Sequence, residues 1–246
     1  MKFFQEAGTD IVGGGTPTVT IHGCGLDALN SPSSFTIMPD RIEAATFGAA
    51  VTICGGEVQL DGVRNAHLGA VRATLFDLGT EIVAESDRTL VLRAKGRPTP
   101  TNIITGSFPC FPTDSQGPYL AALSTSRGVS VLQERLWSNR LSLAMELKRM
   151  GAQIDLLNGQ VAVITGVDQL SGAPVIGTDP RATAALTLAG LFADGETVVT
   201  GNDLLDNAYD SFIEKLRGLN AEVSRVTVPV GIFGHHHPVY GRLEAF

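Results

Sequence analysis

A short helix-ending turn occurs four times along this chain, and its spacing limits what the chain can fold into. The four sites are Ala7-Gly8-Thr9, Leu78-Gly79-Thr80, Met150-Gly151-Ala152 and Leu219-Asn220-Ala221, separated by 71, 72 and 69 residues. Glycine and asparagine are the residues that best tolerate the left-handed backbone that closes many helices. This period exceeds the roughly 20–50 residues of solenoid repeats, so each copy has the size of a βαβαββ subdomain. We therefore expect three copies that pack together into one domain.

Each copy starts with an apolar helix that lacks a polar face, which predicts that the helix is buried. A strand, an amphipathic helix and two further strands follow it. In copy one these are helix 41–53, strand 58–60, a helix with Leu68, Val71, Leu75 and Leu78 on one face, and strands 81–84 and 89–94. Copy two has strands 129–132, 153–157 and 160–165 and a helix with Leu143, Leu147 and Met150. Copy three has helix 181–193, strand 197–200 and a helix with Tyr209, Phe212, Ile213, Leu216 and Leu219.

Residues 1–38 precede the first copy. Segment 1–12 resembles the last turns of a helix, a cap at Gly8 and a strand, so this helix has no proper beginning in the sequence. Further strands are expected at Thr18–Ile21 and, leading to Asp40, at Ser34–Met38, with a loop at 23–33 between them.

Composition and charge exclude several classes of protein. With 246 residues, 43% of them hydrophobic, the chain can form a folded core. The formal charge of -7 and the pI near 5.2 show no excess of positive charge that would bind nucleic acid or an anionic membrane. No apolar run approaches the roughly 18 residues that span a bilayer, and we expect a cytoplasmic protein. The three cysteines are widely and unevenly spaced, which favours unpaired, buried thiols over disulfides or a zinc site.

Acidic residues stand at the starts of the three apolar helices. Asp40 and Asp179 precede two of them, and Asp114 precedes the third, where Pro112 holds the approach extended and Thr113 and Asp114 are both common capping residues. If the helices run side by side, their unpaired N–H groups meet at one end and favour anions. Each acid there is either a general base or a helix cap, and the residue pattern leaves both alternatives open. That end carries Asp40, Arg41, Asp114, Gln116, Asp179 and Arg181.

Five ordered motifs resemble one family of enzymes. They are Met38-Pro39-Asp40-Arg41-Ile42-Glu43-Ala44, Phe111-Pro112-Thr113-Asp114-Ser115-Gln116, Asn139-Arg140, Asp179-Pro180-Arg181-Ala182 and Glu214-Lys215-Leu216-Arg217-Gly218-Leu219. They are similar to the UDP-N-acetylglucosamine 1-carboxyvinyltransferase family, which belongs to the EPSP synthase-like superfamily, over about residues 1–226. The resemblance implies a mixed α/β (α+β) fold, an inside-out α/β barrel of three βαβαββ repeats in which sheets surround buried helices.

The same resemblance implies a reaction and roles for the acids. The reaction is enolpyruvyl transfer from phosphoenolpyruvate to the 3-hydroxyl of UDP-N-acetylglucosamine, a step of peptidoglycan biosynthesis for the cell wall. Asp114 would accept the proton of the sugar hydroxyl and contact the UDP-sugar. Asp40 and Asp179 would act in proton transfer and closure at the domain interface.

Other positions would bind the substrates. The resemblance places Leu136 against the nucleotide and Arg140 and Arg181 around the groups of phosphoenolpyruvate, and Arg41 joins them as a substrate-binding residue. No cofactor and no metal ion is implied.

Two departures from the family pattern limit what the chain is expected to do. Only a remnant of the first family domain is expected, at 1–38, ahead of the second domain at 39–226 and a tail at 227–246. A separate chain would have to supply the first domain, with its lysine and mobile-loop cysteine, and we expect the isolated chain to be inactive. Asn207 stands where the family has an arginine and lacks its charge and bidentate fork.

Two other interpretations remain beside the transferase. One is a non-catalytic UDP-sugar-binding or regulatory domain, and the other is a truncated gene product. The run His235-His236-His237 fits a flexible tail better than a metal site, because consecutive side chains point in different directions. We interpret His22 and His67 as structural and do not expect Cys110 to be a nucleophile.

Overall fold

The chain divides between Met38 and Pro39 into two units. The computed structural model describes residues 1–14, 16–30, 32, 34–226 and 239–242. The first unit contains helix α1 (Lys2–Glu6), the antiparallel strands β1 (Asp10–Val12) and β2 (Thr20–His22) and the 3-10 helix η1 (Leu26–Ala28). Gly8 follows α1 with a φ of +101°, so the predicted helix end is confirmed.

The strand expected at Ser34–Met38 is absent, and this prediction was wrong. Residues 34–38 lie in no strand, and Ile37 and Met38 are 82% and 65% exposed. The prediction relied on the alternation of side chains, whereas a strand also needs a neighbour that completes its backbone hydrogen bonds. No strand of the described chain pairs with this segment.

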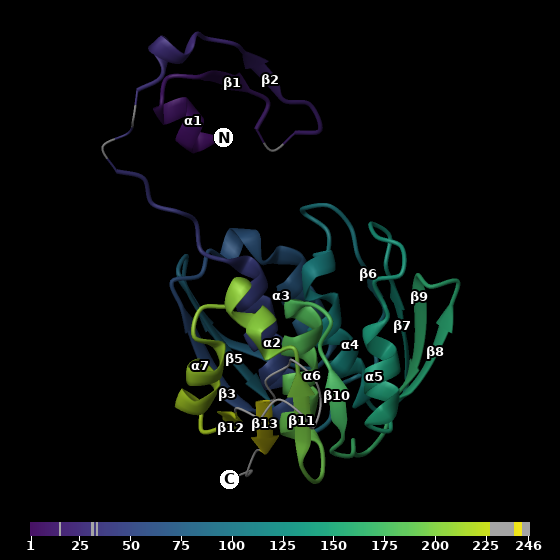
Figure 1. Cartoon of the computed structure of the whole chain (residues 1–246). Helices are drawn as coiled ribbons and strands as arrows, with labels where there is room; N and C mark the ends of the chain where they lie inside the picture. Colours follow the sequence, from purple (N-terminus) through teal and green to yellow (C-terminus); the bar gives the residue numbers. More distant parts are fainter. Residues whose placement is uncertain (15, 31, 33, 227–238, 243–246) are drawn as a thin grey trace. The chain divides into compact units, whose positions relative to one another are not determined.

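The second unit, Pro39–Phe246, contains the three copies in the predicted order (Figure 1). Copy one consists of α2 (Arg41–Cys54), β3 (Gly56–Asp61), η2 (Asn65–His67), α3 (Gly69–Asp77), β4 (Glu81–Glu85) and β5 (Thr89–Ala94). Copy two consists of β6 (Ile103–Ile104), η3 (Thr113–Ser115), α4 (Gln116–Ser124), β7 (Val129–Gln133), α5 (Leu143–Arg149), β8 (Gln153–Leu157) and β9 (Val161–Thr165). Copy three consists of β10 (Pro174–Ile176), α6 (Pro180–Phe192), β11 (Thr197–Thr200), η4 (Asn202–Asn207), α7 (Phe212–Gly218), β12 (Glu222–Arg225) and β13 (Val239–Arg242).

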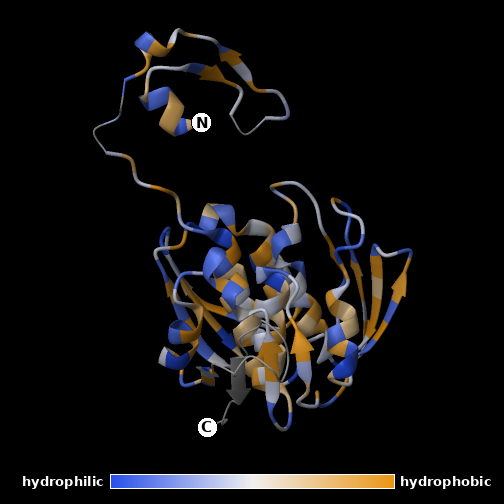
Figure 2. Cartoon of the chain, in the orientation of Figure 1, coloured by the Kyte–Doolittle hydropathy of each residue, from blue (hydrophilic) through white to orange (hydrophobic). Residues whose placement is uncertain are grey.

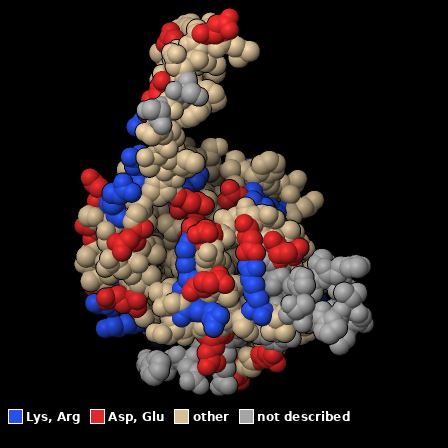
Figure 3. Space-filling model, turned by 60° about the vertical axis from the view of Figure 1, so that its left-hand side comes forward, with Lys and Arg blue, Asp and Glu red and all other residues tan. Residues whose placement is uncertain are grey.

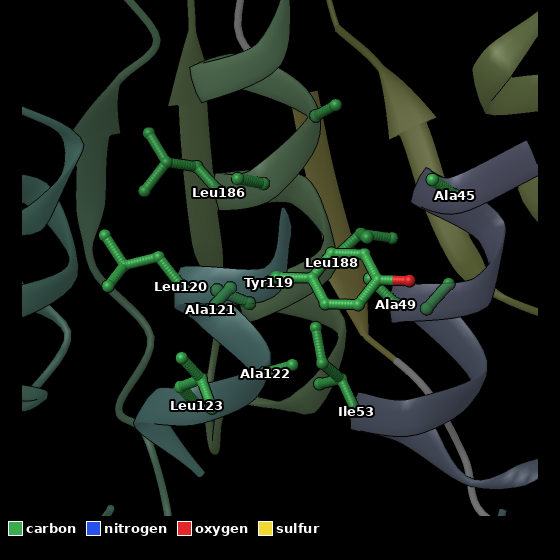
Figure 4. Close-up of a cluster of buried hydrophobic side chains, with 14 of the residues drawn as sticks. Ala45, Ala49, Ile53, Tyr119, Leu120, Ala121, Ala122, Leu123, Leu186 and Leu188 are labelled. Atoms are coloured by element: carbon green, nitrogen blue, oxygen red, sulfur yellow. The ribbon is translucent and has the colours of Figure 1, made fainter. Parts of the chain in front are cut away.

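The apolar helices α2, α4 and α6 lie side by side at the centre of this unit (Figures 1 and 4). Every residue of α4 is buried, as are ten consecutive residues of α2 and ten of α6. The small side chains of Ala45 and Ala49 leave room for the ring of Tyr119, which points from α4 towards α2 (Figure 4). The prediction that these helices form the core is therefore confirmed.

The amphipathic helices end in one recurring turn. Gly79, Gly151 and Asn220 have φ values of +88°, +91° and +65°, all in the left-handed region. In each turn, as at Gly8, the N–H of the following residue donates to the carbonyl five positions earlier, at 2.8–3.0 Å. In Figure 2 the outer helices α5 and α7 carry both hydrophobic and hydrophilic residues. The predicted period and the amphipathic helices are confirmed.

Three separate sheets cover the helices. Their strand orders are β3-β5-β4, β6-β7-β9-β8 and β10-β11-β13-β12, and within the described residues they do not join into one continuous barrel. β6 and β10 pair in parallel with β7 and β11, while the other neighbours are antiparallel. β13 belongs to the segment expected to be a tail, and it lies between β11 and β12 of copy three. β9 has the equivalent position between β7 and β8 of copy two. No sequence pattern indicated β13.

The helix expected around Tyr209 begins later than predicted. Ser211, directly before α7, has left-handed backbone with a φ of 51°, which interrupts a continuous helix. Tyr209 is buried in the turn between η4 and α7 instead of on the helix itself.

The copies join differently at the end of the third amphipathic helix. Leu78 and Met150 are 1% and 0% exposed, and their carbonyl groups accept the N–H groups of Thr99 and Ser171, which lead into the next copy. Leu219 holds the same place in copy three but is 40% exposed, so its predicted burial was wrong. A groove of about 560 Å³ lies here between α2, β3 and α7.

Cys24, Cys54 and Cys110 are unpaired, as predicted, but Cys24 and Cys110 are exposed. The expectation of buried thiols fails for these two because both lie in loops, which run over the surface. Burial raises the pKa of the Cys54 thiol to about 12. Among the described helices, none is long and apolar enough to cross a membrane.

Candidate active site

Asp40 and Asp179 cap the helices that they precede. Asp40 Oδ1 accepts the N–H of Ile42 at 2.7 Å. Asp179 Oδ1 accepts the N–H groups of Arg181 and Ala182 at 2.9 and 3.1 Å. Both acids have extended backbone, which lets a side chain reach the free N–H groups of its own helix.

Asp114 caps no helix, so of the two roles left open for it the structure excludes capping. It lies inside the 3-10 turn η3, and Ser115, directly before α4, makes no capping hydrogen bond with its side chain. Because Asp114 lies inside this turn instead of before it, its carboxylate accepts no N–H group of α4 among the described hydrogen bonds. It remains at the helix mouth, as expected, and bonds to other partners.

Two arginines hold Asp114. Arg140 Nη2 and Arg181 Nη1 donate to the same oxygen, Oδ1, at 2.5 and 2.9 Å. Arg181 Nε also donates to Asp179 Oδ1 at 3.1 Å, so one guanidinium joins the acids of copies two and three. The Asp114 side chain is 44% exposed, and its Oδ2 has no hydrogen-bond partner among the described residues. One oxygen of the carboxylate is therefore fixed while the other is open.

The segment between β7 and Arg140 forms one wall of this site. Leu136 and Trp137 are exposed, and the guanidinium of Arg140 lies 5.9 Å from the centre of the Trp137 ring. Their backbone N–H groups donate to Glu134, which is fully buried. Sequence reasoning missed Glu134, although a charged residue directly after an apolar strand was a usable signal.

Asp40 and Arg41 do not join the arginine cluster directly. Arg41 lies over the ring of Phe108, 5.8 Å from its centre, and that ring also meets His67 edge to face. Asp40 bonds only to its own helix among the described contacts. Of the predicted site residues, the structure brings together Asp114, Arg140, Arg181 and Asp179, while Leu136 lies in the turn whose N–H groups bond to Glu134.

Tyr209 is a buried hydroxyl close to all three helix mouths. Its oxygen lies 3.1 Å from Thr46 Oγ1 of α2. Burial raises the pKa of Tyr209 to about 12, while the bond to Thr46 and the charge of Arg181 act against the shift and the charges of Asp40 and Asp114 add to it. The sequence pattern had indicated only an apolar helix face here.

The surface around the mouth has little enclosed volume. A cleft of about 10 Å³ is lined by Arg140, Arg181, Asp179 and Gln116, among others. Gln116 Nε2 donates to the Arg140 carbonyl at 3.0 Å, and Asn207 is exposed at the end of η4. On the face shown in Figure 3, acidic and basic side chains alternate over the second unit. Within the described residues no group of three His, Cys, Asp or Glu suits a metal ion, and the histidine run 235–237 lies outside them.

Known proteins resemble both the sequence and the fold. The model of the EPSP synthase (3-phosphoshikimate 1-carboxyvinyltransferase) family matches residues 1–216. A UDP-N-acetylglucosamine 1-carboxyvinyltransferase from Trichlorobacter lovleyi is 41% identical over 92% of this chain and 53% of its own length. One from Desulfofundulus thermocisternus is 42% identical over 91% of this chain and 90% of its own length. The chain spans about half the length of the Trichlorobacter relative.

Solved structures share the fold. The enolpyruvyl transferase NikO from Streptomyces tendae has a TM-score of 0.77 and 25% identity, over 87% of this chain and 51% of that one. An EPSP synthase from Acinetobacter baumannii has a TM-score of 0.62 and 20% identity over 86% and 47%, which supports the fold alone. Because the family model and relatives at 41–42% identity run through nearly the whole chain, it belongs to the UDP-N-acetylglucosamine 1-carboxyvinyltransferase family, within the EPSP synthase family.

Proposed function

We propose that this chain forms the part of an enolpyruvyl transferase that binds UDP-N-acetylglucosamine and accepts the proton of its 3-hydroxyl on Asp114. One observation carries the proposal: Oδ1 of Asp114 is held by two guanidinium groups while Oδ2 is free among the described residues. A general base must be fixed in direction and within reach of the proton that it accepts. A carboxylate with one anchored and one open oxygen meets both conditions.

The reaction defines what the site has to do. A bond forms between the sugar 3-oxygen and the carbon of phosphoenolpyruvate that carries the phosphate, and the bond from that carbon to the phosphate oxygen breaks. The phosphate leaves with the electron pair of the broken bond, and the hydroxyl proton passes to Asp114. The protein must therefore hold a hydroxyl beside Asp114 and an anion beside the arginines.

Arg140 and Arg181 are placed to hold that anion. Their donors engage Asp114, Thr113 and Asp179. A phosphoenolpyruvate molecule would be bound by donors of these guanidinium groups other than the two that hold Asp114 Oδ1, so that the base stays anchored with Oδ2 open to the sugar hydroxyl. Guanidinium groups suit this role because their planar donors bind phosphate and carboxylate in pairs. Leu136 would lie against the nucleotide, and Arg41 would bind substrate. Asp40 and Asp179 would act in proton transfer and closure.

The complete reaction needs more than this half. Its relatives from Trichlorobacter lovleyi and Parasynechococcus marenigrum are about twice as long as the matched region. We propose that the remaining half, supplied by a separate chain, covers the helix mouths, excludes water and completes anion binding. We propose that this two-part enzyme acts in the cytoplasm.

The test compares the chain alone with the chain and the unmatched half of the Trichlorobacter relative. Binding of UDP-N-acetylglucosamine is measured by calorimetry, and turnover by phosphate release and mass of the product. We expect binding by the chain, no product from the chain alone and product from the mixture. Turnover by the chain alone would refute the two-part enzyme, and failure of every form to bind the UDP-sugar would refute the assignment of the site.

Asn207 favours a second function, a UDP-sugar-binding domain without catalysis. The residue is exposed at the end of η4, and the family arginine that the resemblance places here would add a bidentate anion donor. We expect Asn207→Arg to raise turnover of the mixture, with Gln153→Arg, which adds the same charge on the outer strand β8, as the control. A mixture that binds the UDP-sugar but stays inactive with Asn207→Arg supports the binding domain.

A further inference from the structure

Glu134, directly after β7, is completely buried and has no part in the proposed chemistry. Its Oε1 accepts the backbone N–H groups of Leu136 and Trp137 at 2.7 and 3.1 Å, and its Oε2 accepts the hydroxyl of Thr113 at 2.6 Å. We propose that Glu134 is a positioning residue that fixes Thr113 and the turn before Arg140, and so aims Arg140 at Asp114. The inference rests on the proposed function of Asp114.

A relay of hydrogen bonds leads from Glu134 to the candidate base. The Thr113 hydroxyl has one proton, and it donates this proton to Glu134, so a lone pair of its oxygen faces outward. Arg140 Nη1 donates to that oxygen at 3.1 Å, and Nη2 of the same guanidinium donates to Asp114 Oδ1 at 2.5 Å. The acceptor character of Glu134 therefore keeps the Thr113 oxygen free to accept from Arg140, whose other nitrogen donates to Asp114.

The second oxygen of Glu134 holds the wall of the site. By accepting two consecutive N–H groups it closes the turn that presents Leu136 and Trp137. Arg140 follows that turn after Asn139, whose φ of 59° is left-handed, and its carbonyl is held by Gln116 at 3.0 Å. The wall and the arginine thus share one buried anchor.

A glutamine at this position would break the pattern whichever way it turns. All three partners of Glu134 are donors, and a carboxylate offers only acceptors. The amide NH₂ group of Gln would face either the two backbone N–H groups or the Thr113 hydroxyl. In the second case the hydroxyl has to turn its proton towards Arg140, which has no acceptor. Leaving such a buried group unmatched shifts the equilibrium between the held and the released turn by roughly tenfold or more, and binding that needs the held turn weakens accordingly.

The alternative is that Glu134 only anchors the end of β7. A purely structural anchor would lower stability without changing the wall or the arginine. Glu146 provides the matched control, because its Oε2 accepts the N–H of Ile176 at 2.9 Å but none of its bonds reach the wall or Arg140. Thr113→Ser and Thr113→Val form a second pair, since serine keeps the hydroxyl and valine keeps the shape without it.

Trp137 is the only tryptophan of the chain, so its fluorescence reports on the turn. The experiment measures the anisotropy of Trp137 and the dissociation constant for UDP-N-acetylglucosamine in the full chain and in each variant. We expect Glu134→Gln to lower the anisotropy and weaken binding about tenfold. Thr113→Val should keep the anisotropy but weaken binding, while Thr113→Ser and Glu146→Gln should match the wild type in both measurements.

The outcomes separate this inference from the function on which it rests. If Glu134→Gln behaves like Glu146→Gln in both measurements, or Thr113→Val binds as tightly as Thr113→Ser, Glu134 does not position Arg140. If Glu134→Gln fails to fold, the Thr113 pair decides the relay. If the wild type does not bind the UDP-sugar, the proposed function fails, and the anisotropy of the variants still shows whether Glu134 holds the turn.

Discussion

The starts of α2 and α6 use their acids differently from the start of α4, although all three occupy the same place in the repeat. Asp40 and Asp179 accept N–H groups of their own helices at 2.7–3.1 Å. Asp114 accepts guanidinium groups from Arg140 and Arg181 instead. The cause lies in the backbone, because Asp40 and Asp179 are extended whereas Asp114 lies inside a 3-10 turn. The repeat supplies the scaffold, and the candidate site forms where one copy departs from it.

The substitution Asp114→Asn tests this difference most strongly. Asparagine keeps the shape of the side chain but cannot accept the hydroxyl proton, so turnover of the two-part enzyme should fall by about 10²–10⁴-fold. Because Asp114 caps no helix, the melting temperature should change little. Turnover and thermal unfolding are measured together, with Asp155→Asn, an exposed acid on β8, as the control. A mutant that unfolds readily while activity persists would make Asp114 a structural residue.

The features that could be predicted from the sequence depend on local physics repeated many times. Gly79, Gly151 and Asn220 mark helix ends because few other residues tolerate left-handed backbone there. The inner helices followed from their lack of any polar face, which leaves burial as the stable arrangement. Both signals recur in each copy, so chance agreement at one site matters little.

The features that could not be predicted depend on single residues or on distant partners. β6 and β10 are two and three residues long, too short for a periodic pattern. The interruption at Ser211 and the missing strand at Ser34–Met38 depend on neighbours that the local sequence does not reveal. The same holds in the site, where Arg140 and Arg181 meet Asp114, and Glu134 meets Thr113, only through the fold.

Removing the side-chain caps of α2 and α6 should lower the stability of the fold. Asp40→Ala leaves the N–H of Ile42 without its partner, and Asp179→Ala does the same to Arg181 and Ala182. We expect each to lower the free energy of unfolding by about 1 kcal/mol, and Asp40→Asn and Asp179→Asn to lower it much less, since asparagine caps as well as aspartate. Urea unfolding measures the difference. Equal losses for the alanine and asparagine variants would mean that charge, not capping, matters.

Tyr209 tests whether burial and the charges at the starts of the three helices raise the pKa of one buried hydroxyl. Its phenol is neutral in the folded state, and its pKa is raised to about 12. In the unfolded chain a tyrosine ionises near pH 10, so this stabilising contribution is present below about pH 10 and is lost as the pH rises towards about 12. Tyr209→Phe should flatten that loss in unfolding experiments between about pH 10 and 12, with Tyr119 still contributing. Its cost near neutral pH should be small, about 0.5 kcal/mol, because Thr46 keeps its bond to the Ile42 carbonyl. If Tyr209→Phe leaves the pH dependence of the unfolding free energy unchanged, the fold does not raise the pKa of Tyr209.

The smallest effect is expected from Asp206, which provides the surface reference for Asp114. Arg225 Nη1 donates to Asp206 Oδ2 at 2.6 Å, and this hydrogen bond lowers the pKa of Asp206. A lowered pKa means that the contribution to stability is present above the ordinary value of about 3.9 and is lost as the pH falls through the folded value. Asp206 and Arg225 are 53% and 36% exposed, so solvent and salt screen the pair strongly. Asp206→Asn should therefore reduce the acid sensitivity of the melting temperature only slightly, and less at high salt. If Asp114→Asn, measured alongside it, changes stability no more than Asp206→Asn while abolishing turnover, the arginine pairing of Asp114 serves the site and not the fold.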